Sequence, residues 1–186
     1  MKDVINFDEI DELGPQSYDA TFNDITVADV DRFEVVGVGP VRIEANAEKV
    51  SDAEYVVDGM LHFTADFDCS RCLEPYPFAN TSNFHVRFRP RPAATPENEE
   101  VEITAAEELD VEFYTEREIP LRDLALEQVQ LVIPMKPLCE ENCLGLCPSC
   151  GANRNRETCR CDESAGDERW GALAGIRDQL AKKKQV

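Results

Sequence analysis

The sequence predicts an α+β protein: a mainly antiparallel, barrel- or sandwich-like β-sheet with one packing helix, a cysteine-rich knuckle and a C-terminal helix. Three observations support this fold class. Several long runs alternate apolar and polar residues, one later segment changes to helical spacing, and eight cysteines fall into four close pairs. We expect a β-rich body with one helix over residues 1–138 and the knuckle with the last helix over residues 139–186.

Three alternating runs predict the main strands. They cover residues 41–47, 61–69 and 84–89, and each keeps one apolar face. Alternation with a period of two is typical of half-buried strands. A sheet with one solvent-exposed face is more often antiparallel than parallel.

Two segments lack this alternation. Residues 1–17 are acidic and without a clear period, which predicts an irregular or lightly structured lead-in. Residues 89–98 contain three prolines, which cannot donate to a strand ladder, so we expect a loop there.

An acidic run follows, with ten acids and one base between residues 97 and 118. Its simplest interpretation is a solvated face, and the alternative is a docking surface for a basic partner. Partner-binding candidates in the run are Glu99, Glu100, Glu107 and Glu108. Val111 and Phe113 alternate with Glu112 and Tyr114, which predicts another strand with a charged outer face.

Residues 121–133 predict the packing helix. Apolar residues recur at helical spacing, Pro120 stands where a first helical turn tolerates proline, and Pro134 ends the helix. A last helix is expected over residues 167–183, where Trp170 and Leu173 begin an apolar stripe.

The net charge of −19 is unevenly distributed. Residues 1–150 hold 32 of the 38 acids and 11 of the 19 bases, a balance of −21, whereas residues 151–186 carry +2. Such a negative field repels phosphate backbones and favours basic protein partners. We expect a cytoplasmic protein without membrane spans, because no apolar stretch reaches about 18 residues and the N-terminus lacks a secretory signal.

In a reducing compartment, close cysteine pairs favour metal binding over disulfides. Structural zinc takes four ligands, usually as two close pairs. The motif CPSCG, with a glycine that permits a tight turn, and the CRC that follows predict one zinc site. Its ligands are Cys147, Cys150, Cys159 and Cys161.

The remaining pairs predict a second site, so we expect one or two zinc ions per chain. Its ligands would be Cys69 and Cys72 in a hairpin turn, and Cys139 and Cys143 after the helix. Zinc would then join the turn to the exit of the helix. In the alternative arrangement, one site forms among the last six cysteines and leaves Cys69 and Cys72 as free thiols.

Catalysis is not favoured. The CSRC motif follows a strand and no helix start activates its thiols, which argues against redox chemistry. Both histidines, His62 and His85, fall on polar strand faces, and catalytic zinc usually keeps an open position among His, Glu or Cys ligands. We expect neither an enzyme nor a small-molecule substrate.

The stretches FDCSRCLEPY, LVIPMKPLC, CLGLCPSCGANRN and CRC together resemble the YceD family of large ribosomal RNA subunit accumulation proteins, in the version with a C-terminal cysteine cluster. The resemblance covers roughly residues 35–182. It implies a non-enzymatic role in large-subunit assembly, with a gene commonly beside that of a small basic ribosomal protein.

Two mechanisms follow from these features. In the first, the acidic body binds a basic ribosomal protein or a pre-ribosomal particle. In the second, the tail contacts ribosomal RNA directly through Arg154, Arg156 and Arg160, which lie within the knuckle.

Overall fold

The computed structural model describes residues 3–32, 34–92 and 111–161. The chain divides into two compact units, Met1–Glu141 and Asn142–Val186. Helices and strands all lie in the first unit, in the order β1, α1, β2, α2, β3, β4, β5, β6, β7 and α3, as far as the described residues show.

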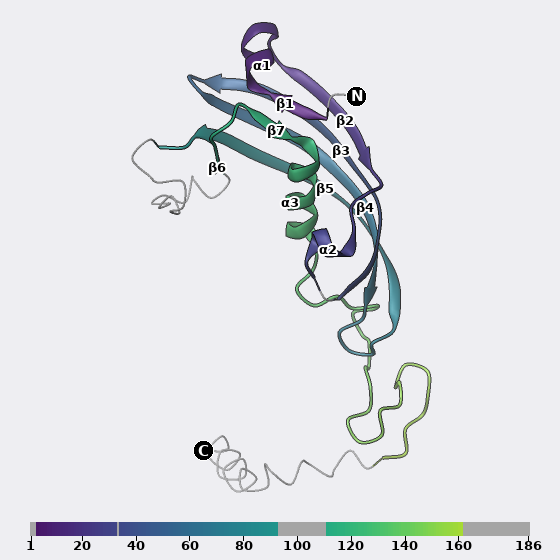
Figure 1. Ribbon diagram of the computed structural model, residues 1–186. Coiled ribbons are helices and arrows are strands. Elements are labelled where there is room, and N and C mark those ends of the chain that lie inside the picture. The colour runs from purple at the N-terminus through teal and green to yellow at the C-terminus, as the bar shows by residue number, and fades with distance from the viewer. Residues whose placement is uncertain (1–2, 33, 93–110, 162–186) are drawn as a thin grey trace, which may run out of the picture. The chain divides into compact units, whose positions relative to one another are not determined.

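A five-stranded sheet is the centre of the first unit (Figure 1). Its order is β2-β3-β4-β5-β6, and every neighbouring pair is antiparallel except the parallel pair β5 and β6. The sheet is open, with β2 and β6 at its edges, so the predicted α+β class with a mainly antiparallel sheet is confirmed, without closure into a barrel among the described strands. Its strands are β2 (Gln16–Phe22), β3 (Val35–Ser51), β4 (Glu54–Asp68), β5 (Pro75–Pro90) and β6 (Val111–Tyr114).

The alternating runs form the strands that they predict. Val41, Ile43 and Ala45 of β3 are buried, and in the pairing of β3 with β4 they lie opposite Phe63, Leu61 and Gly59. Burial of this one face creates the core, because the intervening positions, such as Arg42 and Asn46, remain exposed.

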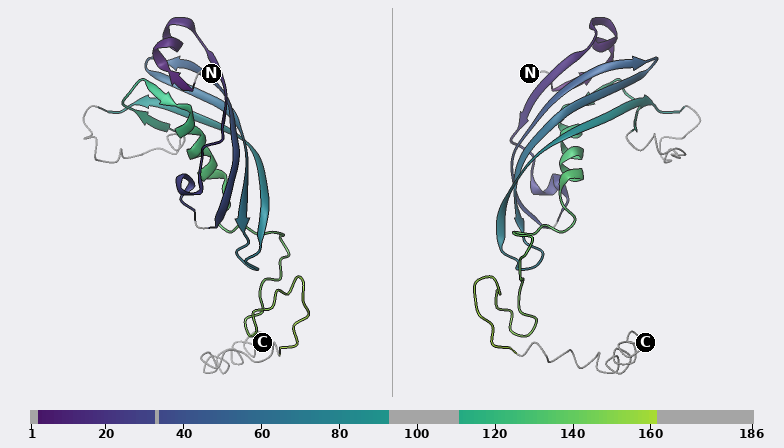
Figure 2. Two further views of the ribbon diagram at one scale, coloured as in Figure 1. Left: turned by 45° about the vertical axis from the view of Figure 1, so that its right-hand side comes forward. Right: turned by 180° about the vertical axis from the view of Figure 1, so that it is seen from behind.

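Helix α3 (Leu121–Val132) covers the concave side of the curved sheet, as the two views in Figure 2 show together with the short helix α2 (Val27–Val30). Its apolar stripe is buried, including Leu121, Leu124 and Val129. The helix begins after Pro120 and ends at Val132, before Pro134, which confirms the predicted packing helix.

The N-terminal segment consists of regular elements, so the prediction of an irregular or lightly structured lead-in over residues 1–17 is wrong. It contains β1 (Val4–Asn6), α1 (Phe7–Leu13) and the start of β2. Asn6 caps α1, because its Oδ1 accepts hydrogen bonds from the backbone N–H groups of Asp8 at 2.8 Å and Glu9 at 3.1 Å. Strand β1 pairs with β7 (Glu118–Pro120), a contact between segments more than 100 residues apart that no local pattern encodes.

Strand β6 exists as predicted, but its faces are reversed. Tyr114 is buried, its ring lies 4.9 Å from that of Phe7, and its hydroxyl donates to the carbonyl of Ala53 at 2.9 Å. Glu112 pairs in register with Phe88, a fully buried residue of the core face, and is itself only half-exposed. The ring contact with Phe7 and the hydrogen bond to Ala53 hold Tyr114 inside, and Glu112, two residues earlier in the strand, therefore lies on the same side and not on the expected outer face.

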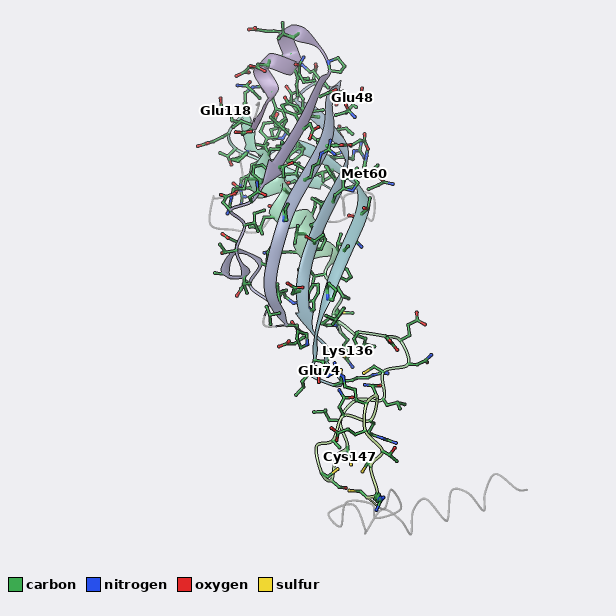
Figure 3. The ribbon with its side chains drawn as sticks, turned by 90° about the vertical axis from the view of Figure 1, so that its right-hand side faces the viewer. Glu48, Met60, Glu74, Glu118, Lys136 and Cys147 are labelled. Carbon is green, nitrogen blue, oxygen red and sulfur yellow. The ribbon has the colours of Figure 1, made fainter. Side chains whose placement is uncertain are left out.

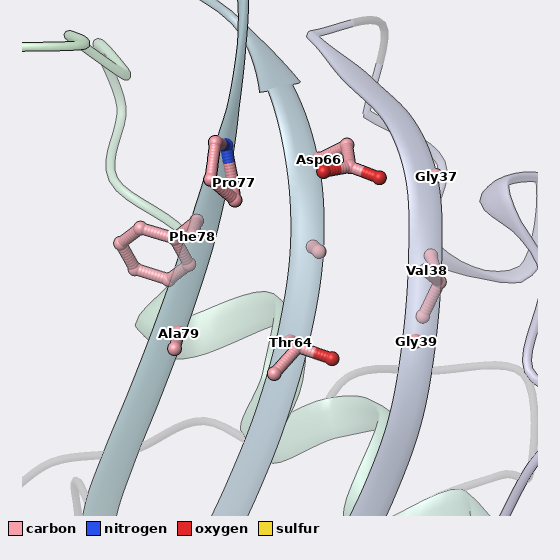
Figure 4. A pocket seen from close by; sticks show the side chains of 9 residues that line it. Gly37, Val38, Gly39, Thr64, Asp66, Pro77, Phe78 and Ala79 are labelled. Atoms are coloured by element: carbon pink, nitrogen blue, oxygen red, sulfur yellow. The ribbon is translucent and has the colours of Figure 1, made fainter.

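Two glycines leave a shallow hollow of about 420 Å³ on the exposed side of the sheet (Figure 4). Thr64 and Asp66 of β4 extend over Gly39 and Gly37 of β3, where an added Cβ would meet their side chains. Among the described residues that line the hollow, Asp66 alone is charged, and we assign the hollow no function.

The predicted helix over residues 167–183 and the candidates Glu99, Glu100, Glu107 and Glu108 lie outside the described residues. Among the described helices, none has the length and apolar character needed to cross a membrane.

Candidate metal centres

The CSRC motif lies in the turn between β4 and β5, as predicted from the alternation that ends at Cys69. The backbone N–H of Ser70 donates to the carbonyl of Pro137 at 2.9 Å, and Arg71 Nη1 donates to the carbonyl of Glu141 at 3.2 Å. These bonds hold the turn against the segment that follows α3. In Figure 3, Glu74 and Lys136 mark this end of the sheet, and Glu48 and Glu118 mark the other.

Cys69, Cys72, Cys139 and Cys143 form the first cysteine group, whose four sulfur atoms lie within 4.8 Å of one another. The sulfurs of Cys72 and Cys139 are 3.7 Å apart. Four sulfurs placed tetrahedrally at about 2.3 Å from zinc are separated by about 3.8 Å, so this spacing fits a metal ion. It is far too long for a disulfide, whose sulfurs lie about 2.05 Å apart.

Cys147, Cys150, Cys159 and Cys161 form the second cysteine group, with the same limit of 4.8 Å between sulfurs. The sulfur of Cys159 lies 3.6 Å from that of Cys150 and 3.3 Å from that of Cys147. The structure thus brings together the two sets of four that the spacing predicts. It does not support the alternative that leaves Cys69 and Cys72 outside any site. Both donor sets suit zinc, and zinc binding itself stays a prediction.

The two CxxC turns share one backbone design. In the first, the N–H of Leu73 donates to the carbonyl of Cys69 at 2.9 Å, and the N–H of Cys69 donates to the carbonyl of Glu74 at 3.0 Å. In the second, Gly151 bonds to Cys147 at 2.8 Å, and Cys147 bonds to Ala152 at 2.8 Å, at the same positions of the motif. This repeat of the hydrogen bonds places both thiols of each pair on one side of a tight turn.

Both turns need a residue with positive φ directly after the second cysteine. Gly151 has φ +76°, which confirms the role predicted for the glycine of CPSCG. Leu73 occupies the same position with φ +58°, a conformation that is unfavourable for leucine. The turn is therefore retained in the first group despite the backbone strain.

The turns favour thiolates at their first cysteines. Burial opposes ionisation of Cys69, but backbone N–H groups of Cys139, Cys72 and Arg71 donate to its sulfur, and its pKa falls to about 6. Backbone N–H groups of Cys150 and Ser149 likewise lower the pKa of Cys147 to about 6. Hydrogen bonds that stabilise a thiolate also suit a sulfur that ligates a metal cation.

The last cysteine of the second group shows the opposite shift. Its neighbours Cys159 and Cys150 raise the pKa of Cys161 to about 12. Four sulfurs this close cannot all ionise without a compensating positive charge, which a metal ion would supply.

Asn155 is a supporting residue that the sequence analysis missed. Its Nδ2 donates to the sulfur of Cys143 at 3.2 Å, and its Oδ1 accepts from the backbone N–H of Leu144 at 2.7 Å. Such contacts orient a ligand from outside the metal's own coordination sphere. No cysteine spacing marks this residue, because its role depends on the loop folding back.

The other candidates lie outside the two groups. Of the three arginines of the knuckle, Arg156 and Arg160 are exposed and Arg154 is half-buried. His62 lies 2.9 Å from the hydroxyl of Thr81, and His85 forms a contact of 2.6 Å with Asp58 on the solvent side of the sheet. Neither histidine belongs to a cysteine group.

Comparison with known proteins gives a consistent result. The model of the family described as "Large ribosomal RNA subunit accumulation protein YceD" matches residues 57–177. A chloroplast protein of Arabidopsis thaliana, named large ribosomal RNA subunit accumulation protein YCED homolog 1, is 24% identical over 147 residues, covering 69% of this chain and 46% of that protein. Uncharacterized proteins of Mycobacterium bovis and Mycobacterium tuberculosis are 30% identical over 136 residues, covering 70% of this chain and 59% of each.

The chain spans about half the length of the curated relatives that it matches, between 46% and 59%. No solved structure matches it. The family model includes the first CxxC turn, helix α3 and all eight cysteines, and extends over more than half of the chain. The chain therefore belongs to the YceD family.

Proposed function

We propose that this protein is a non-enzymatic cytoplasmic factor that supports the accumulation of large-subunit ribosomal RNA, and that it acts by binding a basic ribosomal protein. Membership of the YceD family is the observation that supports a role in the accumulation of large-subunit ribosomal RNA. The mechanism is our inference from the distribution of charge. Ribosomal proteins rich in lysine and arginine are the natural partners of a strongly acidic surface.

The charge of the chain supports a protein partner over RNA. Residues 1–150 carry −21, which attracts a basic protein over long distances and repels a phosphate backbone. Zinc does not reverse this balance, because a zinc ion held by four thiolates has a formal charge of −2. Two such centres would make the folded protein more acidic.

We propose that zinc occupies both cysteine groups and has a structural role. All four positions of each site would be filled by sulfur, which leaves no open position for a substrate. The ions would fix the hairpin turn of the sheet and the loop that carries the arginines. Function would then lie in the surfaces that the ions shape.

Retention of purified large-subunit proteins tests the mechanism. The immobilised zinc-loaded chain is incubated with these proteins at about 50 mM and about 300 mM salt, because charge-driven association weakens steeply as salt screens it. We expect one or a few basic proteins to be retained selectively at low salt. Failure to enrich any basic protein over an immobilised unrelated protein of similar net charge would rule the mechanism out.

Direct RNA binding through the knuckle is the second candidate, because Arg156 and Arg160 are exposed on a loop that the second cysteine group organises. The described loop from Asn142 to Cys161 has three arginines and one glutamate, a balance of +2 that the −2 of a zinc–thiolate centre would cancel. This is why we favour the protein partner. Crosslinking to ribosomal RNA in cells that is lost on changing Arg154, Arg156 and Arg160 to glutamate would instead favour RNA.

A further inference from the structure

A pocket of about 270 Å³ lies between α3 and the strands β5 and β6. Its apolar walls come from Phe84, Val86, Val111 and Leu131, and its polar side chains are Glu112, Glu127 and Gln128. Glu112 enters it because β6 presents this residue in register with Phe88 of the core face. A carboxylate at such a position requires an explanation, because burial without a partner costs free energy.

No cation among the described residues balances the two carboxylates. Neither Glu112 nor Glu127 forms an ion pair with any described residue, and no lysine or arginine lines the pocket. The nearby arginines of β5, Arg87 and Arg89, both pair with Glu54, at 2.8 and 3.3 Å. Residues 93–110, which precede β6, contain neither lysine nor arginine, so that segment cannot supply the charge either.

The pocket also contains a polar side chain without a partner. Gln128 of α3 is only 9% exposed and makes no side-chain hydrogen bond within the described ranges. Its amide atoms are not fully buried, so they are available to a hydrogen-bond donor that enters the pocket. Its carbonyl oxygen and the two carboxylates together offer acceptors to a donor that carries positive charge.

The form of the pocket indicates what kind of cation it suits. A hydrated divalent ion prefers six or more oxygen ligands, whereas here four apolar residues surround three polar ones. Lysine and arginine carry a charged group on an aliphatic stem, and such stems lie well along apolar surfaces. Leu131, which is 77% exposed at the pocket, provides such a surface.

We propose that this pocket receives a lysine or arginine side chain from a basic polypeptide partner. The proposal rests on the proposed function and gives it a site: Glu112 and Glu127 neutralise the incoming charge, Gln128 accepts a hydrogen bond, and Leu131 contacts the stem. The inward-facing glutamate of β6 thereby acquires a role in recognition.

Electrostatics of the free protein agree with this assignment. Burial and the charge of Glu127 raise the pKa of Glu112 to about 7, and burial and the charge of Asp123 raise the pKa of Glu127. His85 of β5 also borders the pocket, but its ring lies on the solvent side of the sheet, where it contacts Asp58. A bound cation would relieve the repulsion and lower both pKa values.

The test uses a labelled, end-blocked octalysine peptide as the probe and measures binding by fluorescence anisotropy at low salt. Three zinc-loaded full-length proteins are compared: wild type, Glu112→Gln/Glu127→Gln and a control, Glu48→Gln/Glu116→Gln. The control removes the same charge from exposed positions outside the pocket. We expect the pocket variant to bind about tenfold more weakly and the control to change by less than about twofold.

Equal affinities of the two variants would overturn the proposal, because the pocket would then contribute no more than general acidity. Because the variants could fold differently, a second measurement uses only the wild-type protein and follows the pKa of Glu112. Carbon-13 NMR of the Glu112 carboxyl should show that its pKa falls by about one unit or more when octalysine is added. A pKa that does not change at saturating peptide would overturn the proposal independently.

The same variants separate this inference from the proposed function. If the wild type and the pocket variant retain the same ribosomal protein equally well, the pocket assignment fails and the function stands. If octalysine requires the pocket but no ribosomal protein is retained, the function fails and the cation site stands.

Discussion

Leu73 and Gly151 occupy equivalent positions in two turns with the same hydrogen bonds, yet only one of them is a glycine. Left-handed φ costs an L-residue about 1–2 kcal/mol. At Gly151, an added Cβ would meet nothing within 4 Å, so the cost of a side chain there would come from the backbone alone. These two positions therefore isolate the effect of φ in a metal-binding turn.

We predict that Leu73→Gly changes the free energy of unfolding by less than about 0.5 kcal/mol, because relief of strain offsets the greater entropy of the unfolded chain. Gly151→Ala should instead weaken the second centre by about 1 kcal/mol, since alanine must adopt positive φ. Chelator competition measured for each centre would show the difference. If Leu73→Gly and Gly151→Ala weakened metal binding equally at their centres, the shared design of the turns would be contradicted.

Glu112 should make stability depend on pH. Its pKa is raised from 4.5 to about 7 by burial and the charge of Glu127, so between these values the folded state holds a proton that the unfolded state has lost. The free energy of unfolding should therefore fall as pH rises from 5 to 8, by about 1–2 kcal/mol after allowance for partial exposure.

Glu112→Gln should remove that fall, and hence stabilise the protein at pH 8 but not at pH 5. Urea denaturation of both proteins across this range would measure it. Glu116→Gln, at an exposed position, serves as the control and should retain the wild-type slope. If the free energy of unfolding of Glu112→Gln depended on pH as strongly as that of the wild type, Glu112 would ionise normally in the folded protein.

At the scale of elements, a polar network joins α1 to β4 and to the segment before β7. Arg117 Nη2 donates to Asp11 at 2.6 Å and to the hydroxyl of Tyr55 at 2.8 Å, and its Nε pairs with Asp8. The Tyr55 ring is fully buried and stacks on Phe7 with ring centres 4.1 Å apart. The network thus fixes the N-terminal helix over the end of the sheet.

We predict that Arg117→Met lowers the free energy of unfolding by about 1–3 kcal/mol, because Asp8 and Tyr55 each lose a charged partner. Arg42→Met is the matched control. Arg42 pairs with Asp19 and Glu44 on the exposed side of the sheet, where an ion pair contributes about 0–1 kcal/mol. Thermal denaturation of both variants would decide whether the network stabilises the protein more than a surface pair does.

At the scale of the whole molecule, the two cysteine groups predict two bound zinc ions per chain. Cys69→Ser and Cys150→Ser should each reduce the zinc content to about one ion, and the double variant should bind none. Because a structural zinc site contributes about 10–16 kcal/mol in small peptides, chelation should unfold the loop around the second group.

Amide NMR signals would follow this change residue by residue. Signals from residues 143–161 should collapse when zinc is removed, whereas those of β3 and β4, which have a buried core of their own, should persist. One ion per chain that is unaffected by Cys69→Ser would show that the first group does not bind zinc.

The long alternating strands, helix α3 and the grouping of the cysteines could be predicted because each depends on a local period or spacing. The pairing of β1 with β7 could not, since only the folded sheet brings Val4 to Pro120. In β6, four residues were too few to decide the orientation, and the aromatic contacts of Tyr114 turned Glu112 inward. The positive φ of Leu73 could not be predicted either, because leucine is not a residue type that favours this conformation.

One consequence concerns self-association. Strand β6 pairs with β5 only at residues 87–90, so within the described part of the chain the rest of β5 has no neighbour on that side. An unpaired edge is a template on which another strand can add. Pro75 and Pro77 blunt its beginning, because proline lacks the N–H that such a strand would need, while residues 79–86 keep their donors. This stretch is where intermolecular β-pairing would start if the protein aggregates.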